Sequence, residues 1–399
     1  MGTWDDASGA TRSSALQQLM VRIRSADLRA RAVLQRFMSL PRPIRALFVT
    51  FVAVVVLFVT SSHSIFSSRN PTFNPSVWHT FEGSFNKGAP FTIALPDPQR
   101  DHNTRVIRTN WYEDALGDAF RVVLSQRCTS ADYVIDIGAN LGIFSATSAA
   151  FGCSVLAVEA QTRHVPFIRA TAAANGWGGG PGDRMEVRAV AVYDKPGALR
   201  IAYHTPAANA SGWLSMAMDE QSLAECPSQP GCAIESVPVV EGHTLITRDT
   251  LLLKIDVDGP EARIVKSVLP ALATHTVENI LMEICPPFWR DISRQDGMDI
   301  LRQLPFAHGY EVVLLDQISF DAYKPGFLER CRFIDGVFRP KAYAMPAAMF
   351  DELFDDTTTS VNCKNVLFTL DLTKLVNRWP GGVVLEPVAP PVAALTAAA

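Results

Sequence analysis

A glycine-rich turn between two apolar runs constrains the fold of this chain more than any other feature. The run 134–137 leads into Gly138-Ala-Asn-Leu-Gly142, a helical stretch follows, and a second apolar run, 154–158, ends at Glu159. This order of strand, turn, helix and strand is typical of an open α/β sheet. In such a sheet, glycines let a nucleotide approach the backbone, and the late acid accepts hydrogen bonds from ribose hydroxyls. The segment therefore predicts a doubly wound, mostly parallel sheet with a nucleotide site.

Asp136 narrows the choice of nucleotide. It stands inside the turn, two residues before Gly138, where the pyrophosphate of a dinucleotide would meet unfavourable negative charge. S-adenosyl-L-methionine carries a sulfonium and an ammonium group, and it tolerates a nearby carboxylate. We therefore expect S-adenosyl-L-methionine as the cofactor.

A second informative segment is 251–261, L-L-L-K-I-D-V-D-G-P-E, an apolar strand that ends in a cluster of acids. Together with D-x-G-x-N-x-G and its trailing V-E-A, it resembles the FkbM family of S-adenosylmethionine-dependent methyltransferases. The resemblance covers about 133–316, less than half of the chain, and the two motifs stand in the order that the family has. One residue departs from the family pattern, because Asp258 stands where the family usually has Glu.

The resemblance implies a Rossmann-like class I methyltransferase that methylates a hydroxyl oxygen of a glycan, a lipid or a small metabolite. It also implies roles for five residues of the turn and its surroundings. The backbone at Gly138 and Gly142 would approach the methionine part of the cofactor, Asp136 would hold its ammonium through bound groups, Asn140 would shape the turn, and Glu159 would bind the ribose hydroxyls.

Three acids end predicted strands on the side where ligands bind in such sheets. Asp256, Asp258 and Glu283 are therefore candidates for binding the acceptor or for acting as general base. Asp258 has a competing role as helix cap, with Glu261 as its capping-box partner. Lys254 alternates with buried residues of its strand, and we expect it to pair with one of these acids.

Asp194 is a further candidate for cofactor binding, because in other methyltransferases an acid after the third strand contacts the adenine amino group. The sequence Asp194-Lys-Pro-Gly is also typical of a simple turn. Both interpretations stay open at this point.

The amino-terminal part predicts membrane anchoring. Residues 46–62 are uncharged and dominated by Val, Phe and Leu, which is near the lower length limit for a membrane-spanning helix. An Arg-rich tail, 1–45, precedes them, so the positive-inside rule leaves the tail in the cytosol and sends the rest across. We expect a signal-anchor at 46–62, a stem at 63–110 and a lumenal catalytic domain in the endoplasmic reticulum or Golgi. A buried core helix, a signal-peptide h-region and an organelle transit peptide are the alternatives.

The remaining residues predict an FkbM-like domain over 111–320, an extension of the domain over 321–386 and a disordered tail over 387–399. Within them, 205–233 is expected to be a surface loop. Helices are expected at 111–124, 143–151, 165–174 and around 298–304, and strands at 133–137, 154–158, 185–192, 199–204, 251–257, 279–284, 310–315 and 365–370.

Composition and charge exclude several classes of protein. With 48% apolar and 19% charged residues, the chain is neither mostly disordered nor a polytopic membrane protein. The net charge of −4 is unevenly spread, because residues 1–45 hold eight Arg and three Asp and thus carry +5, which leaves −9 for the rest. A catalytic part with this negative charge is not expected to bind nucleic acid, whose phosphates require clustered Lys and Arg, and it favours a small or neutral acceptor.

The seven cysteines form no C-x-x-C pair, so we expect no metal site. Cys226 and Cys232 form the most plausible short disulfide if the domain is lumenal. Cys153 and Cys285 each stand beside a buried strand, and we expect both to be free core thiols.

Two rival functions fit parts of the sequence. The tripeptide 256–258 matches the D-x-D pattern with which glycosyltransferases bind a divalent metal and a nucleotide sugar, and such enzymes share the anchored arrangement. The chain could also be a catalytically silent binding module. The glycine turn with its late acid favours the methyltransferase, because a D-x-D transferase does not need that turn.

Overall fold

The structure, a computed structural model, divides into two compact units, and the residues that it describes all belong to the larger one, Phe73–Ala399. The predicted tail 1–45, the predicted signal-anchor 46–62, the terminal segment 387–399 and Asp258 lie outside the described residues. Among the residues that are described, no helix is long and apolar enough to cross a membrane. The described ranges are 78–81, 90–96, 114–125, 127–204, 223–224, 226–228, 232–257, 259–289, 291–315, 326–334, 342–354 and 363–377.

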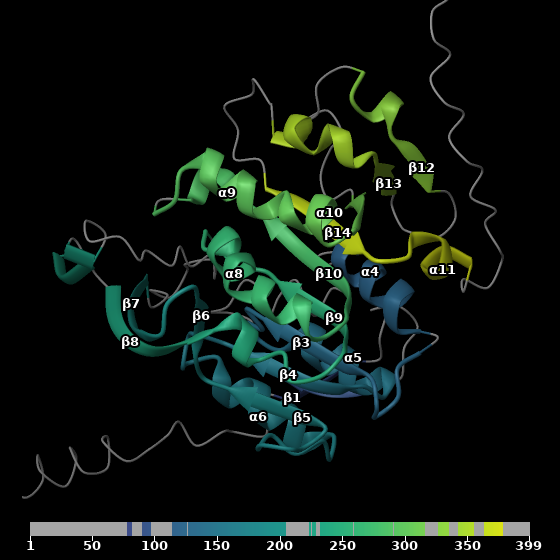
Figure 1. Cartoon of the computed structure of the whole chain (residues 1–399). Helices are drawn as coiled ribbons and strands as arrows, with labels where there is room; N and C mark the ends of the chain where they lie inside the picture. Colours follow the sequence, from purple (N-terminus) through teal and green to yellow (C-terminus); the bar gives the residue numbers. More distant parts are fainter. Residues whose placement is uncertain are drawn as a thin grey trace, which may run out of the picture. The chain divides into compact units, whose positions relative to one another are not determined.

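A nine-stranded sheet organises the described part of the chain (Figure 1). In sheet order the strands are β5 (Met185–Arg188), β4 (Ser154–Val158), β3 (Tyr133–Ile137), β9 (Thr250–Ile255), β10 (Val277–Ile284), β14 (Lys364–Thr369), β11 (Glu311–Leu315), β13 (Ala342–Met345) and β12 (Arg332–Ile334). The first five of these strands are mutually parallel, β14 is antiparallel to both of its neighbours, and the pairs β11–β13 and β13–β12 are also antiparallel.

The direction of winding reverses between β3 and β9. From β3 the chain proceeds through β4 to β5, and from β9 it proceeds the opposite way to β10. Right-handed crossovers therefore place the connecting helices on opposite faces of the sheet, which defines a doubly wound fold. The prediction of a doubly wound, mostly parallel sheet is confirmed.

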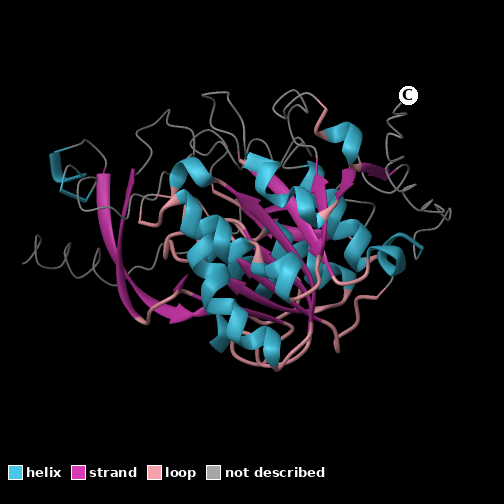
Figure 2. Ribbon diagram, turned by 45° about the horizontal axis from the view of Figure 1, so that its top comes forward, coloured by secondary structure: helices cyan, strands magenta, loops and turns pink. Residues whose placement is uncertain are grey.

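Helices cover both faces (Figure 2). Alternate strand residues point to opposite sides, so that Val134 packs in one apolar core and Ile135 in the other. The first core contains α4 (Asp114–Leu124), α5 (Ile143–Phe151), α6 (Val165–Ala174) and α11 (Leu372–Asn377), and the second contains α8 (Glu261–Val268), α9 (Arg294–Leu301), α10 (Gln303–Ala307) and the 3-10 helix η8 (Ala347–Phe354). Shorter 3-10 helices are η2 (Cys226–Ser228), η3 (Gly242–Thr244), η4 (Leu269–Ala273), η5 (Pro286–Phe288) and η7 (Leu328–Arg330).

A smaller sheet is inserted between β5 and β9. It has the order β6 (Ala191–Tyr193), β8 (Cys232–Glu241) and β7 (Gly197–His204), and its long β7–β8 pair is seen at the left of Figure 1. The single strand predicted over 185–192 is therefore wrong. Arg188 is the last residue of this segment that bonds to the large sheet, and its carbonyl accepts from the Glu159 N–H at 3.0 Å. Ala191 already pairs with Val239 of the small sheet.

Part of the predicted stem belongs to the folded domain. The strand β1 (Trp78–Phe81) pairs with β2 (Phe91–Ala94), and β2 is mostly buried. The Thr92 N–H donates to the side-chain oxygen of Asn175, which directly follows α6, at 2.9 Å. The Ala94 N–H donates to the hydroxyl of Thr171 in α6, also at 2.9 Å. The structure thus places residues 91–94 against the domain instead of in a free spacer.

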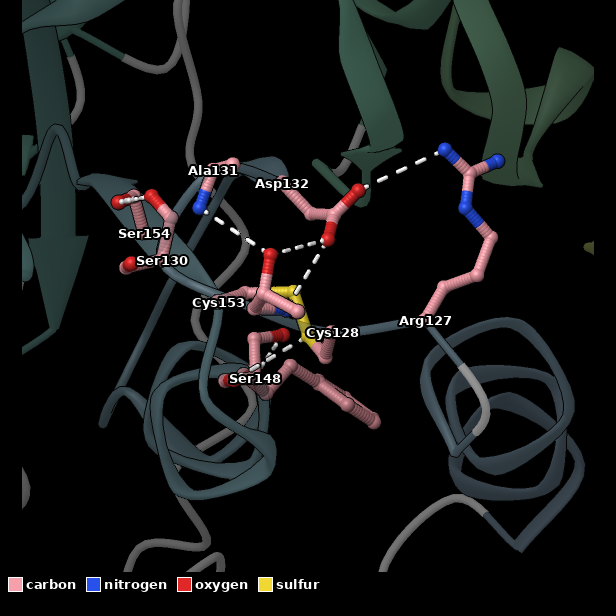
Figure 3. Close-up of a disulfide and its surroundings, with 10 residues drawn as sticks. Arg127, Cys128, Ser130, Ala131, Asp132, Ser148, Cys153 and Ser154 are labelled. Atoms are coloured by element: carbon pink, nitrogen blue, oxygen red, sulfur yellow. Dashed lines mark hydrogen bonds and ion pairs between the residues drawn. A yellow bond between two sulfur atoms is a disulfide. The ribbon is translucent and has the colours of Figure 1, made fainter.

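Six cysteines form three disulfides. The predicted bridge between Cys226 and Cys232 is confirmed. The prediction that Cys153 and Cys285 are free thiols is wrong, because Cys153 is bonded to Cys128 (Figure 3) and Cys285 to Cys363. In both cases the fold brings a distant residue close, with Cα atoms 4.8 Å and 4.3 Å apart, which no local spacing reveals.

Candidate functional site

The candidate site lies at the carboxyl ends of β3 and β9, where the strand order reverses. Open α/β sheets bind ligands in the crevice at this point, because the connections leave in opposite directions there. The turn 138–142 follows β3, Asp256 follows β9, and Glu159 follows the adjacent strand β4. The fold therefore brings both sequence motifs to one edge of the sheet.

Left-handed backbone conformations shape the glycine turn. Gly138, Asn140 and Gly142 have φ angles of 80°, 51° and 82°. The turn is tied to β4, since the N–H groups of Gly138 and Ala139 both donate to the Val158 carbonyl, at 2.9 Å and 3.0 Å. Only glycine adopts this conformation without strain, and Asn tolerates it better than most residues.

The two glycines also permit close packing within the protein. A Cβ atom at Gly138 would lie 1.9 Å from the carbonyl oxygen of Asp256, so the turn touches the backbone at the end of β9. A Cβ at Gly142 would lie 3.1 Å from Ile168 of α6. The glycine pattern therefore holds β3, β9 and α6 together, in addition to any role toward a ligand.

Asp136 is completely buried and already has partners. Its Oδ2 atom accepts a hydrogen bond from the Ser145 hydroxyl at 2.6 Å, and its Oδ1 atom lies 3.2 Å from the Lys254 ammonium. A carboxylate in this position reaches a ligand only through the groups that it holds. The role of Asp136 toward the cofactor ammonium stays a prediction, and the groups that it contacts are Lys254 and Ser145.

Lys254 is the buried cation of the site, with 1% of its side chain exposed. Its Nζ atom lies 3.0 Å from Asp256 Oδ2 and donates to the Gly138 carbonyl at 3.2 Å, and it stands 5.2 Å from the centre of the Phe144 ring. The predicted pairing of Lys254 with an acid is confirmed for Asp256.

Glu159 is buried and is held by backbone donors. Its two oxygens accept hydrogen bonds from the backbone N–H groups of Asn140 at 2.6 Å and Gln161 at 2.7 Å. Burial raises the pKa of Glu159 to about 7, although these two hydrogen bonds oppose the shift. The nearest ring, His164, has its Nδ1 3.9 Å away, and burial together with Arg163 lowers the pKa of His164 to about 3. The imidazole is therefore neutral near pH 7, and its contact with Glu159 is not an ion pair.

Asn140 presents an unused acceptor beside this carboxylate. Its Oδ1 atom is buried and has no hydrogen-bond partner among the described residues. A buried amide oxygen without a partner is costly, so it marks a place where a donor from a ligand would be favourable. The turn is thus suited to bind a group that carries N–H or O–H donors.

The acceptor candidates differ in their surroundings. Asp256 is 22% exposed and is held by Lys254, so one face of its carboxylate is open to solvent. Glu283 is half-buried near the end of β10, and its carboxylate lies within 4.8 Å of the sulfurs of Cys285 and Cys363. These sulfurs form a disulfide, so they do not make a metal site with Glu283. Asp258 lies outside the described residues.

Asp194 has partners that the sequence does not predict. Its carboxylate, 3% exposed, lies 2.9 Å from Arg263 and 3.2 Å from Lys266, both on α8. Burial by itself would raise the pKa of Asp194, but the hydrogen bonds from these two cations lower it overall. In this structure Asp194 therefore links the end of β6 to α8, and its contact with an adenine remains a prediction.

Glu261 joins the loops that follow β9 and β10. The helix α8 has Pro260 at its N-cap, so the capping box predicted between Asp258 and Glu261 is not the arrangement found. The buried Glu261 carboxylate instead accepts from the Gly259 N–H at 3.1 Å and from the Trp289 indole N–H at 2.8 Å. An acid three residues beyond a possible cap is the signal for a capping box, but only the fold brings Trp289 within reach.

Comparisons with known proteins give no family by sequence. No protein-family model matches this chain, and no curated protein matches it. Among solved structures, it is similar to methyltransferase FkbM from Methylobacillus flagellatus KT (11% identity, TM-score 0.31, covering 55% of this chain and 44% of that one). It is also similar to a SAM-dependent methyltransferase from Agrobacterium tumefaciens (8% identity, TM-score 0.31, covering 76% and 73%) and to precorrin-6Y C5,15-methyltransferase from Geobacter metallireducens GS-15 (11% identity, TM-score 0.28, covering 64% and 88%).

These likenesses are distant, and this chain matches less than half of the length of the first protein. By its strand order the described domain is a doubly wound, Rossmann-like α/β domain, and the candidate site lies at its switch point.

Proposed function

We propose that this protein is an S-adenosylmethionine-dependent methyltransferase. The observation that carries the proposal is the meeting of the glycine turn 138–142 with the buried acid Glu159 at the switch point of the sheet. Fold alone does not define a reaction, so the proposal depends on this site.

The residues present fit the cofactor. The Asn140 oxygen lacks a donor, and each Glu159 oxygen uses one backbone N–H, which leaves further lone pairs for ribose hydroxyls. Gly138 is half-buried, so its backbone can approach the methionine part of the cofactor, and Asp136 orients Lys254 and Ser145 beside it. When bound, S-adenosylmethionine supplies an electrophilic methyl group on a sulfonium.

The acceptor side is proposed to lie at Asp256, Asp258 and Glu283. Asp256 orients an acceptor hydroxyl and takes its proton, because its carboxylate is partly exposed next to the glycine turn. Holding the hydroxyl in line with the transferred group supplies much of the rate. We propose a hydroxyl of a glycan, a lipid or a small metabolite as the acceptor.

We further propose that the domain is lumenal and anchored by residues 46–62. The support from the described residues is the set of three disulfides, since disulfides persist in oxidising compartments and are rare in the cytosol.

A D-x-D glycosyltransferase is the second candidate, and one contact disfavours it. The Lys254 ammonium lies 3.0 Å from Asp256, the first acid of the tripeptide. A divalent cation bound there would be repelled by this buried positive charge. A silent binding module remains the alternative that only measurement separates from an enzyme.

Isothermal titration of the full chain in detergent with S-adenosylhomocysteine tests the proposal. We expect binding by the wild type and at least tenfold weaker binding by Glu159→Gln, because the amide N–H₂ would face the backbone N–H of Asn140 or Gln161. Glu241→Gln, at the end of β8, is the matched control and should bind like the wild type.

Two other results would redirect the assignment. A binding heat in titrations with a nucleotide sugar and Mn²⁺, together with no binding heat for S-adenosylhomocysteine, would support the glycosyltransferase. Binding of S-adenosylhomocysteine without transfer of a tritiated methyl group to any glycan, lipid or metabolite fraction would indicate a silent module.

A further inference from the structure

Lys254 connects the two sides of the candidate site. Its ammonium contacts the Gly138 carbonyl on the cofactor side, at 3.2 Å, and the Asp256 carboxylate on the acceptor side, at 3.0 Å. The same ammonium lies 3.2 Å from the buried Asp136. A single side chain from β9 thus holds the first residue of the turn and the acid that ends its own strand.

Burial makes this arrangement more than a surface ion pair. With 1% of its side chain exposed, Lys254 has lost its hydration, and a desolvated ammonium is tolerated only when charges and acceptors around it compensate. Two carboxylates and one carbonyl do so here. One positive charge between two negative charges leaves a net charge of −1, and the more exposed of the two acids is Asp256.

The turn and the end of β9 are also in direct contact. Because a Cβ at Gly138 would lie 1.9 Å from the Asp256 carbonyl oxygen, the backbones of the two segments are packed as closely as glycine allows. A displacement of Gly138 would therefore displace Asp256 as well. Lys254 lies across this contact and bonds to both segments.

We propose that Lys254 is a positioning residue that fixes the Gly138 end of the turn for the amino-acid part of the cofactor and holds Asp256 toward the acceptor. The inference rests on the proposed function, in which the turn binds the methionine part and Glu159 binds the ribose. The direct hydrogen-bond donors of Glu159 are the backbone N–H groups of Asn140 and Gln161, whereas Lys254 contacts the turn at Gly138. Removal of the ammonium should then affect one end of the cofactor and spare the other.

A pair of ligands separates the two ends. S-adenosylhomocysteine carries the amino-acid part, whereas 5′-methylthioadenosine has the nucleoside and lacks it. For Lys254→Met in the full chain, we expect the affinity for S-adenosylhomocysteine to fall about tenfold or more, because one charge-assisted interaction is lost. The affinity for methylthioadenosine should fall less than about twofold. Equal weakening of both ligands, or of neither, would overturn the proposal.

A charge-balanced double variant distinguishes positioning from simple neutralisation. Lys254→Met alone leaves Asp136 buried with Ser145 but without its cation, whereas Asp136→Asn combined with Lys254→Met removes both buried charges. We expect the double variant to recover the melting temperature and to bind methylthioadenosine like the wild type, but to stay weak for S-adenosylhomocysteine. Recovery of the affinity for S-adenosylhomocysteine would mean that Lys254 only neutralises Asp136, and loss of folding in both variants would assign it a purely structural role. Either result overturns the proposal.

Failure of this inference is distinguishable from failure of the proposed function. If the wild type binds neither ligand, the cofactor assignment itself is wrong. If the wild type binds both ligands and the variants show no selective loss, only the role of Lys254 is wrong.

Discussion

The two halves of the large sheet are built in different ways. One half consists of β3, β4 and β5 and is called the cofactor half after its proposed ligand. Its strands follow one another in the chain, lie side by side and are joined by single helices. The other half contains β10, β14 and β11 and is called the acceptor half after its proposed role. There β14, residues 364–369, inserts between β10 and β11, which end at residues 284 and 315. The first half is assembled from neighbouring segments, and the second requires a late strand to return to its centre.

The contacts that stabilise the two halves differ accordingly. The cofactor half relies on close backbone approach at Gly138 and on carboxylates that accept backbone and hydroxyl hydrogen bonds. The acceptor half is joined across long sequence distances by the Cys285–Cys363 disulfide and by Glu261 with Trp289. This comparison predicts that changes in the acceptor half reduce stability, whereas changes in the cofactor half reduce stability and ligand binding together.

The largest expected effect is loss of the Cys285–Cys363 disulfide. Its residues are 78 apart in sequence, which corresponds to a stabilisation of about 4.5 kcal/mol from loop closure. The short Cys226–Cys232 bridge, with a separation of 6, should contribute only about 2 kcal/mol. Urea unfolding of the two double Cys→Ser variants measures both values, and equal losses would contradict the idea that the return of β14 dominates.

Gly138→Ala should have the next largest effect, because it places a methyl group against the Asp256 carbonyl in a backbone region that L residues avoid. We expect a loss of about 3 kcal/mol in the free energy of unfolding and loss of S-adenosylhomocysteine binding.

Gly309→Ala is the matched control. Gly309 has a similar φ of 74°, but a Cβ there meets nothing within 4 Å, so only backbone strain of about 1 kcal/mol is expected, with binding intact. Similar losses in the two alanine variants would show that close approach at Gly138 is unimportant.

Glu261→Ala should destabilise the acceptor half by about 2 kcal/mol, because the buried Trp289 indole N–H loses its acceptor. The Gly259 N–H loses one of two acceptors and keeps the Val257 carbonyl at 3.0 Å. Trp289→Phe removes one of these donors and keeps the ring, so its effect should be smaller. Chemical denaturation measures stability, and titration with S-adenosylhomocysteine should give an unchanged affinity for both variants. Weakened cofactor binding would contradict the separation of the two halves.

The smallest expected effect is a pH dependence of cofactor binding. Since the pKa of Glu159 is about 7, its ionised fraction rises about tenfold between pH 6 and pH 8, and S-adenosylhomocysteine should bind correspondingly more tightly. The pKa of His164, about 3, keeps it out of this range. For Glu159→Gln, titrations at pH 6, 7 and 8 should show the same affinity for S-adenosylhomocysteine at each pH.

Stability should move in the opposite direction. The pKa of Glu159 is higher in the folded protein than the ordinary value of 4.5, so the unfolded chain loses this proton first as pH rises. The contribution of Glu159 to stability is therefore full below pH 4.5 and is lost as the pH rises toward 7. Melting curves of the wild type and Glu159→Gln across this range check the sign.

The sequence predicted β3, β4 and the helices α5 and α6 of the cofactor half in detail. Strands 133–137 and 154–158 and helices 143–151 and 165–174 begin and end where they were expected. The reason is that these elements carry continuous apolar runs and are closed by turn residues such as Gly152 and Asn175. Local signals of this kind are sufficient when neighbouring segments pack on one another.

Prediction was poorer where partners are distant. The strand expected over 185–192 divides between two sheets, the helix expected around 298–304 divides into α9 and α10, and Cys153 and Cys285 are bonded to residues that only the fold brings near. Asp194 follows β6, and its Oδ2 atom is paired with Arg263 and Lys266 of α8, which lie about 70 residues later in the chain.

The sequence by itself determined the doubly wound class of fold and the edge of the sheet at which Gly138, Glu159 and Asp256 meet, because apolar periodicity and turn residues act over short distances. Tertiary structure alone decided which charges are compensated. Lys254 stands 116 residues after Gly138 and 118 after Asp136 in the chain, yet its ammonium contacts both. Desolvation in the assembled core makes that placement decisive, since a buried charge is tolerated only where the fold supplies its partners.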